Sequence, residues 1–237
     1  MKKLIYLLLL LPLGFFNSCD EFLDVSSKQE MLQGETFESQ NGVHMYVNGV
    51  YRLLSETSLY GRELTWGVAS VLGNNYNSTS SSNLGTNYYN VSKYTWEYSG
   101  VQTIMTNIWA KGYNVIANCN NIIQEISKKD TSFFEFGSME KNMILGEMYG
   151  IRAMMHFDLL RLFAPAPVTN PTGLAMPYVT TYPDHQPEHK SVNDVLASII
   201  ADMEKAKGIL APVDTIFCLS WNQSTSGRIY QSSTYSS

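Results

Sequence analysis

The sequence has few cysteines, few basic residues and no apolar run long enough to cross a bilayer. Its 237 residues include only 3 cysteines, which argues against a framework of disulfide bonds. Lys and Arg number 16 against 21 Asp and Glu, so the formal net charge is −5. Nucleic acids and anionic lipid surfaces are bound through clusters of positive charge, and this balance argues against both as partners. The apolar run at 4–16 is shorter than the roughly 20 residues of a membrane-spanning helix.

The N-terminus has the organisation of a lipoprotein signal peptide. Met1-Lys2-Lys3 is a short basic start, the apolar run follows, and Ser18 places a small residue before Cys19. We therefore predict a signal peptide over 1–18 and lipidation of Cys19, whose acyl chains would anchor the protein to a membrane. A plain secreted protein with an isolated cysteine is the alternative. Removal of Lys2 and Lys3 changes the net charge from −5 to −7.

Apolar residues at spacings of three and four predict a mainly α fold. Amphipathic helices in this order are typical of stacked antiparallel pairs, as in an α-solenoid. A polar stretch over about 74–98 is predicted to be an exposed loop, and the proline-punctuated segment 165–190 a long irregular connection. The predicted helices cover about 36–55 with Thr36 as cap, 101–128, 139–163 with Ser138 as cap, and 191–210 with Ser191 as cap.

Aromatic side chains are numerous, with 15 Tyr, 10 Phe and 4 Trp, and several lie in polar segments. An aromatic ring can pack against the C–H face of a sugar, while amides and hydroxyls bond to its hydroxyl groups. For Trp96, glycan contact and anchoring of the loop are equally supported, whereas Tyr98 is expected to anchor the loop. The candidate glycan-binding residues are Trp96, Tyr88, Tyr89, Asn90 and Tyr94.

Catalytic and metal-binding patterns are weak, and we predict neither an enzyme nor a cofactor. Glu147 and Asp158 are 11 residues apart on one predicted helix, about 16 Å, which is too far for a glycosidase pair. In the segment 184–189, Pro187 prevents the helical geometry that would aim two histidines at one metal ion. Arg152 lies beside the apolar face of its helix, so it needs a carboxylate or carbonyl partners.

Four segments in the same order resemble the SusD/RagB family of nutrient-uptake outer-membrane lipoproteins. The most specific is the predicted third helix, 147–163, with a Glu, then Arg-Ala, an aromatic residue and Asp-Leu ahead of a basic residue. The segments 108–118, 18–24 and 173–178 followed by 191–195 also match. Asp20-Glu21 resembles the surface-export signal of Bacteroidetes lipoproteins. The resemblance marks as structural signature residues Glu147, Arg152, Asp158, Trp109, Tyr113 and Asn118.

This resemblance implies tetratricopeptide-like helix pairs with long irregular loops. It also implies a surface-exposed, lipid-anchored lid over a SusC-like TonB-dependent transporter, to which the protein would deliver captured oligosaccharide. A peptide-binding homologue and a tetratricopeptide-like scaffold for protein interactions remain alternatives. A glycoside hydrolase is the third, and it would need a carboxylate pair that the sequence does not offer.

Family members are considerably longer than this chain, and we expect 19–237 to be the N-terminal region of the family fold. Residues 226–229 resemble the start of a further family helix, but 230–237 is rich in Ser and Tyr where an apolar, alanine-rich run is expected. We hypothesise a frameshift, which would place 230–237 out of frame, or an early stop; either would leave the family's C-terminal half missing. A truncated, non-functional remnant is therefore a further alternative.

Overall fold

The computed structural model describes residues 36–77 and 80–213. The chain divides into two compact units, Met1–Ser39 and Gln40–Ser237, and 36–39 are the described residues of the first. The predicted signal peptide, Cys19, Cys218 and the segment 230–237 lie outside the described residues.

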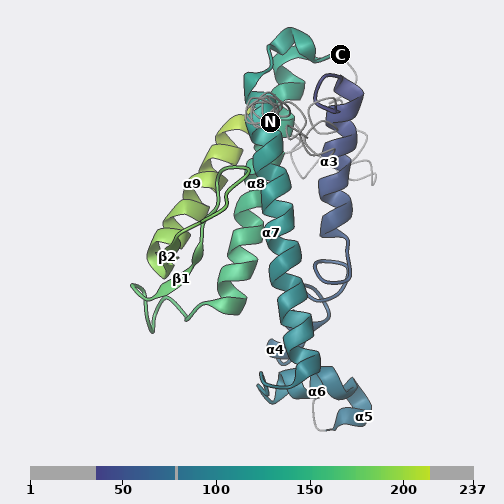
Figure 1. Ribbon diagram of the computed structural model, residues 1–237, viewed down its shortest axis with the longest axis vertical. Coiled ribbons are helices and arrows are strands. Elements are labelled where there is room, and N and C mark those ends of the chain that lie inside the picture. The colour runs from purple at the N-terminus through teal and green to yellow at the C-terminus, as the bar shows by residue number, and fades with distance from the viewer. Residues whose placement is uncertain (1–35, 78–79, 214–237) are drawn as a thin grey trace, which may run out of the picture. The chain divides into compact units, whose positions relative to one another are not determined.

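The second unit is mainly helical, which confirms the predicted fold class (Figure 1). Four long helices account for most of it, and the segment that connects the last two helices forms a two-stranded sheet. Its elements are α3 (Gln40–Leu54), α4 (Val68–Leu72), α5 (Ser81–Leu84), α6 (Thr86–Ser92), α7 (Ser99–Lys128), the 3-10 turn η2 (Thr131–Phe133), α8 (Gly137–Phe163), β1 (Leu174–Pro177), β2 (His189–Ser191) and α9 (Val192–Leu210).

Consecutive long helices pack as antiparallel pairs. Near the middle of α7, Gly112 lies so close to α8 that an added Cβ would be 3.0 Å from a methyl carbon of Leu159. Further along α7, Asn120 accepts a hydrogen bond from Arg152 of α8 at 2.8 Å, so the two helices run in opposite directions. Arg152 and Asp202 join α8 to α9, and Lys111 and Glu56 join α7 to the turn after α3.

Helix α8 is surrounded on several sides, which explains why apolar residues occur all round it. Leu159 faces α7, and Gly146 faces Leu210 at the end of α9. On another side, Glu147 accepts a hydrogen bond from Tyr51 of α3 at 3.0 Å. Figure 1 shows α8 between α7 and α9. Four of its apolar side chains are completely buried, namely Met148, Ala153, Met155 and Leu159. Because α8 has neighbours on so many sides, few of its residues are exposed.

Two predicted helix starts were wrong, and one was confirmed. Helix α3 begins at Gln40 rather than Thr36, and its buried residues are Gly42, Val43, Val47, Val50 and Leu54. Helix α8 begins at Gly137 with no side-chain cap from Ser138. Instead, the carboxylate of Glu140 accepts a hydrogen bond from the Phe136 N–H at 3.1 Å, as the returning half of a capping box does. Ser191 caps α9 as predicted, accepting from the Asp194 N–H at 3.2 Å.

The polar stretch after α3 is not one open loop, which corrects the prediction. It contains the short helices α5 and α6. Helix α6 forms because Val91 is completely buried and because the Tyr88 hydroxyl donates a hydrogen bond to the buried carboxylate of Glu63 at 3.0 Å. One apolar and one polar anchor therefore hold a segment whose composition is typical of a loop.

The connection after α8 contains a short antiparallel hairpin. Leu174 pairs with Ser191 and Pro177 with His189, with an irregularity between Leu174 and Met176. Met176 is completely buried, whereas Leu174 is 75% exposed. No helix within the described ranges has the length and apolar character that a bilayer crossing requires.

Candidate functional site

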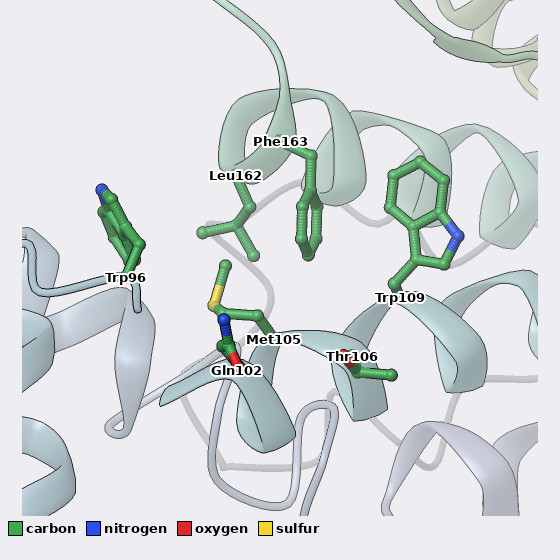
Figure 2. A pocket seen from close by; sticks show the side chains of 7 residues that line it. All are labelled: Trp96, Gln102, Met105, Thr106, Trp109, Leu162 and Phe163. Atoms are coloured by element: carbon green, nitrogen blue, oxygen red, sulfur yellow. The ribbon is translucent and has the colours of Figure 1, made fainter. Parts of the chain in front are cut away.

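An open pocket lies where the start of α7 meets the end of α8. It has a volume of about 640 Å³, within the range of roughly 300–1,000 Å³ that is typical of small-molecule sites. Figure 2 shows the indole rings of Trp96 and Trp109 on opposite sides of it. The lining residues are Trp96, Gln102, Met105, Thr106, Trp109, Leu162 and Phe163.

The local structure explains why these residues share one cavity. Gln102, Met105, Thr106 and Trp109 are spaced by three, four and seven residues, which places them on one face of α7. Leu162 and Phe163 form the last turn of α8, which ends before Pro165 because proline cannot continue a helix. Both helix ends are therefore needed to form the pocket.

Trp109 is held in place by other rings. Its ring centroid lies 5.0 Å from that of Phe163 in an edge-to-face arrangement and 4.9 Å from that of Tyr113. The Tyr113 hydroxyl in turn donates a hydrogen bond to the Pro177 carbonyl at 2.8 Å. Aromatic pairs of this kind contribute about 0.5–1.5 kcal/mol beyond their burial. Contacts with two neighbouring rings therefore hold Trp109 in its orientation.

Trp96 forms the exposed wall of the pocket. Its side chain is 41% exposed, and its ring lies 5.9 Å from the ring of Tyr94, which is itself 61% exposed. Tyr94 has a positive φ of 58°. That conformation is unfavourable for a bulky residue, at a cost of about 1–3 kcal/mol. The positive φ belongs to the end of α6, where the Tyr94 N–H donates to the Val91 carbonyl and the Thr95 N–H to the Asn90 carbonyl, both at 3.0 Å. This is the Schellman arrangement that ends many helices, and it fixes the position of Tyr94 next to Trp96.

The other predicted glycan-binding residues do not line the pocket. Tyr88 contacts Glu63, and burial together with this carboxylate raises the pKa of the Tyr88 hydroxyl to about 12. The ring of Tyr89 lies beneath the Lys93 ammonium group at 5.5 Å, and the Asn90 amide donates to the Thr86 carbonyl at 2.8 Å. The structure thus brings Trp96 and Tyr94 together and places these three elsewhere, where sugar contact stays a prediction.

Sequence reasoning missed five of the lining residues and the second role of Trp109. Gln102, Met105, Thr106, Leu162 and Phe163 carried no prediction of binding, although Leu162 and Phe163 stand in the predicted third helix. The only available indication was that Gln102 and Thr106 place polar groups on the same helix face as Met105 and Trp109. Such a face is neither a normal core stripe nor a normal solvent face.

A second polar constellation is buried between α8, α9 and the segment after β1. Arg152 donates to Asp202 through Nε at 2.7 Å and through a terminal nitrogen at 2.8 Å, a bidentate pair. The Tyr178 hydroxyl also donates to Asp202. Arg152 donates to the Asn120 amide oxygen at 2.8 Å, and the Asn120 amide nitrogen donates to the Val179 carbonyl at 3.1 Å. Asp202 is therefore the carboxylate partner that the buried Arg152 requires.

His156 completes this cluster as a neutral ring. Its Nε2 accepts a hydrogen bond from the Val179 N–H at 3.1 Å, so the proton is on Nδ1, which donates to the Arg152 carbonyl at 2.8 Å. The ring stacks on Tyr178 with centroids 3.9 Å apart. Burial lowers the pKa of His156 to about 4. With both nitrogens engaged and no exposed surface, this histidine is a fixed structural group.

A family model described as "Starch-binding associating with outer membrane" matches residues 21–219. The chain belongs to the SusD-like family. The resemblance expected from the sequence is thus confirmed, and so is the tetratricopeptide-like helical fold, which is that of the solved SusD superfamily structures.

Relatives within the SusD-like family are much longer than this chain. SusD-like protein P25 of Formosa agariphila is 26% identical over 202 residues, covering 83% of this chain and 36% of that protein. A SusD superfamily protein of Bacteroides thetaiotaomicron matches with a TM-score of 0.54 and 22% identity, over 72% of this chain and 37% of its own length. A SusD-like carbohydrate binding protein of Bacteroides vulgatus has a TM-score of 0.56 and 20% identity, over 72% and 36%.

The remaining residues of the SusD-like signature contact other parts of the protein. Asp158 accepts hydrogen bonds from the Tyr60 hydroxyl and, at 2.7 Å, from Nε of Arg161. The Asn118 amide donates to the Asn114 carbonyl at 2.7 Å within α7. Glu147 contacts Tyr51, as described above. The bonds of Glu147 and Asp158 to Tyr51 and Tyr60 join α8 to α3 and to the turn after it, whereas Asn118 bonds within its own helix.

Other chemically capable groups do not form a site. His185, Glu188 and His189 are exposed on the connection between β1 and α9. In the part of the chain that the structure describes, no three His, Cys, Asp or Glu side chains come close enough to hold a metal ion. Cys119 is buried, and burial raises the pKa of its thiol to about 12, so it is unreactive at neutral pH.

Proposed function

We propose that this SusD-like chain binds oligosaccharide in the pocket between Trp96 and Trp109, and that it does so without catalysis. The family description names starch binding at the outer membrane, and the Bacteroides vulgatus relative is named as carbohydrate binding. Because the chain spans little more than a third of its relatives' length, the activity of the whole protein is part of this proposal.

The observation that carries the proposal is the composition of the pocket wall. Two indole rings flank a cavity whose polar side chains are the amide of Gln102 and the hydroxyl of Thr106. Indole faces pack against the C–H groups of a pyranose ring, and amide and hydroxyl groups exchange hydrogen bonds with sugar hydroxyls. The two kinds of group lie close enough to contact one sugar chain together.

We further propose that the chain acts at the cell surface, anchored through Cys19, and passes the glycan to a SusC-like TonB-dependent transporter. The lipoprotein junction at Ser18-Cys19 and the family's association with the outer membrane support this. Mass spectrometry of the mature N-terminus should find a diacylglyceryl cysteine. An unmodified thiol at residue 19 would refute the anchor and would leave the glycan site untouched.

Affinity electrophoresis tests the glycan site directly. Migration of the purified chain should be retarded in gels that contain a recognised polysaccharide, and Trp96→Ala should weaken that retention by roughly tenfold, since a stacked ring supplies about 1–3 kcal/mol in comparable contacts. Trp66→Ala is the matched control, because Trp66 is 58% exposed and does not line the pocket. Equal losses for both variants, or no retention on any polysaccharide, would contradict the proposal.

A protein-interaction scaffold is a second candidate, favoured by apolar side chains on the outer faces of α8 and α9. Phe157 is 45% exposed, Ile200 61% and Met203 41%. Exposed apolar side chains of this size are often covered by a partner. Capture of a transporter by the chain, with no retention on any glycan, would support this candidate over glycan binding.

A further inference from the structure

The pocket is uncharged, and this has a consequence for the ligand. None of its seven lining side chains is ionisable. Gln102 and Thr106 each offer both a hydrogen-bond donor and an acceptor, which matches sugar hydroxyls, since these also do both. A carboxylate or sulfate group only accepts, so it cannot donate to these two acceptors, which would stay bonded to water.

Charges near the pocket do not supply a cation. Arg161, next to Leu162, is paired with Asp158 at 2.7 Å. Lys93, close in sequence to Trp96, lies over the ring of Tyr89. Glu97 follows Trp96 directly and is exposed, and the chain as a whole carries a net charge of −5. The net negative charge of the chain opposes the approach of an anionic ligand.

The apolar part of the wall makes this discrimination stronger. Met105, Leu162 and Phe163 lie between the two indole rings. An anion placed against them loses hydration and gains no ion pair, which is unfavourable. The same chain shows what holding a carboxylate requires, because Asp202 is bound by a bidentate guanidinium and a tyrosine hydroxyl. No such groups line the pocket.

We propose that the pocket selects neutral sugar residues and discriminates against uronic acids and sulfated sugars. This inference rests on the proposed function, since it assigns the class of glycan that the same site accepts. The neutral amide of Gln102 and the hydroxyl of Thr106 are the side chains that determine the preference.

Matched polysaccharides test the preference, because they share one backbone and differ in charge. Retention should be measured in gels of hydroxyethyl starch against carboxymethyl starch, and of hydroxyethyl cellulose against carboxymethyl cellulose. On the backbone that is recognised, we expect the neutral form to bind at least roughly tenfold more tightly, which corresponds to about 1.4 kcal/mol. Equal binding of both forms, or tighter binding of the anionic form, would overturn the inference and leave glycan binding intact. Binding of neither form, on these or any other polysaccharides, would overturn the proposed function as well.

A charge introduced into the pocket tests whether the lining side chains determine the preference for neutral sugars. Gln102→Lys adds a cation to the wall at an exposed position and should reduce the ratio of neutral to anionic binding by roughly fivefold at low ionic strength. Asn107→Lys is the matched control, since Asn107 is exposed on α7 and does not line the pocket. Equal changes for both variants would show that the net charge of the chain sets the preference, and would overturn the assignment to Gln102 and Thr106. Circular dichroism of both variants confirms that the helices are retained.

Discussion

The buried Arg152–Asp202 cluster and the open pocket both combine aromatic rings with polar side chains, but only the cluster contains charged groups. In the cluster, Tyr178 stacks on His156 and donates to Asp202, so each ring and each polar group has its partner inside the protein. In the pocket, Trp96 is 41% exposed, and Gln102 and Thr106 are exposed to solvent. A satisfied cluster holds helices together, whereas an unsatisfied one is available to a ligand. The two regions therefore differ in charge and in whether their polar groups have partners inside the protein.

The largest effect should come from removing the carboxylate of the cluster. Asp202→Ala leaves the Arg152 guanidinium buried without its ion-pair partner, and we expect the free energy of unfolding to decrease by about 3–5 kcal/mol. Urea denaturation followed by circular dichroism measures this.

Glu204→Ala is the control on the same helix, because Glu204 is exposed and pairs with Lys207 at 3.6 Å. Its effect should stay within about 0.5 kcal/mol. If Asp202→Ala does not fold, Asp202→Asn should show a smaller loss in the same direction. Equal decreases in the free energy of unfolding for Asp202→Ala and Glu204→Ala would show that the buried cluster contributes no more to stability than an exposed ion pair.

Acid should weaken the cluster before it affects the pocket. The pKa of His156 is about 4 in the folded chain and 6.5 when unperturbed, so the unfolded chain binds the proton more readily between these values. The contribution of His156 is fully present above about pH 6.5 and is lost as the pH falls towards 4. From about pH 7.5 to about pH 5 we expect a loss of about 2 kcal/mol in the free energy of unfolding. His156→Gln should flatten this dependence, and a slope that the substitution leaves unchanged would show that other groups cause it.

Trp109 belongs to both kinds of region, so its removal should lower stability and affinity together. Trp109→Ala deletes the ring that packs against Phe163 and Tyr113 and also removes one wall of the pocket. We expect the free energy of unfolding to decrease by about 1–2 kcal/mol and the affinity for glycan to decrease roughly tenfold. Calorimetric titration and urea denaturation on the same preparation measure the two quantities. A loss of stability with unchanged affinity would show that only Trp96 contacts the ligand.

The smallest effect should come from a single hydroxyl. Thr106→Val keeps the shape of the side chain but removes its hydrogen-bonding group, and we expect affinity for a neutral glycan to decrease by roughly fivefold, about 1 kcal/mol, with stability unchanged. Thr103→Val is the control, because Thr103 donates to the Ser99 carbonyl on the outer surface of α7. A loss of affinity for the control, or none for Thr106→Val, would place the polar contacts elsewhere.

Much of the helical framework could be predicted from the sequence. The four long helices follow from apolar stripes, and the start of α9 follows from the local chemistry of Ser191 and Asp194. Helix α6 could not be predicted, since it depends on Tyr88 reaching Glu63, 25 residues away. Ser138 likewise does not cap α8, because the helix begins at Gly137 and Ser138 lies inside it, while Glu140 bonds to the N–H of Phe136.

The candidate site was only partly predictable. Trp96 and Trp109 were each singled out, one as a sugar platform and the other as a signature residue, and no local pattern links them. Their common cavity depends on α8 ending with Leu162 and Phe163 beside α7, which is a property of tertiary packing. The need of Arg152 for a partner was evident, but Asp202, 50 residues further along, was one of many acidic candidates.

The residues of α8 that line the pocket and the residue that pairs with α9 lie in different parts of the helix, and Pro165 fixes where the first part ends. Leu162 and Phe163 occupy the final turn before it, whereas Arg152 lies ten residues earlier, about 15 Å away along the helix axis. Insertions or substitutions in the connection after 164 would tilt or fray that last turn and so reshape one pocket wall, without reaching the ion pair that fixes α8 to α9. The last turn of α8 and the ion pair of Arg152 can therefore be altered independently of each other.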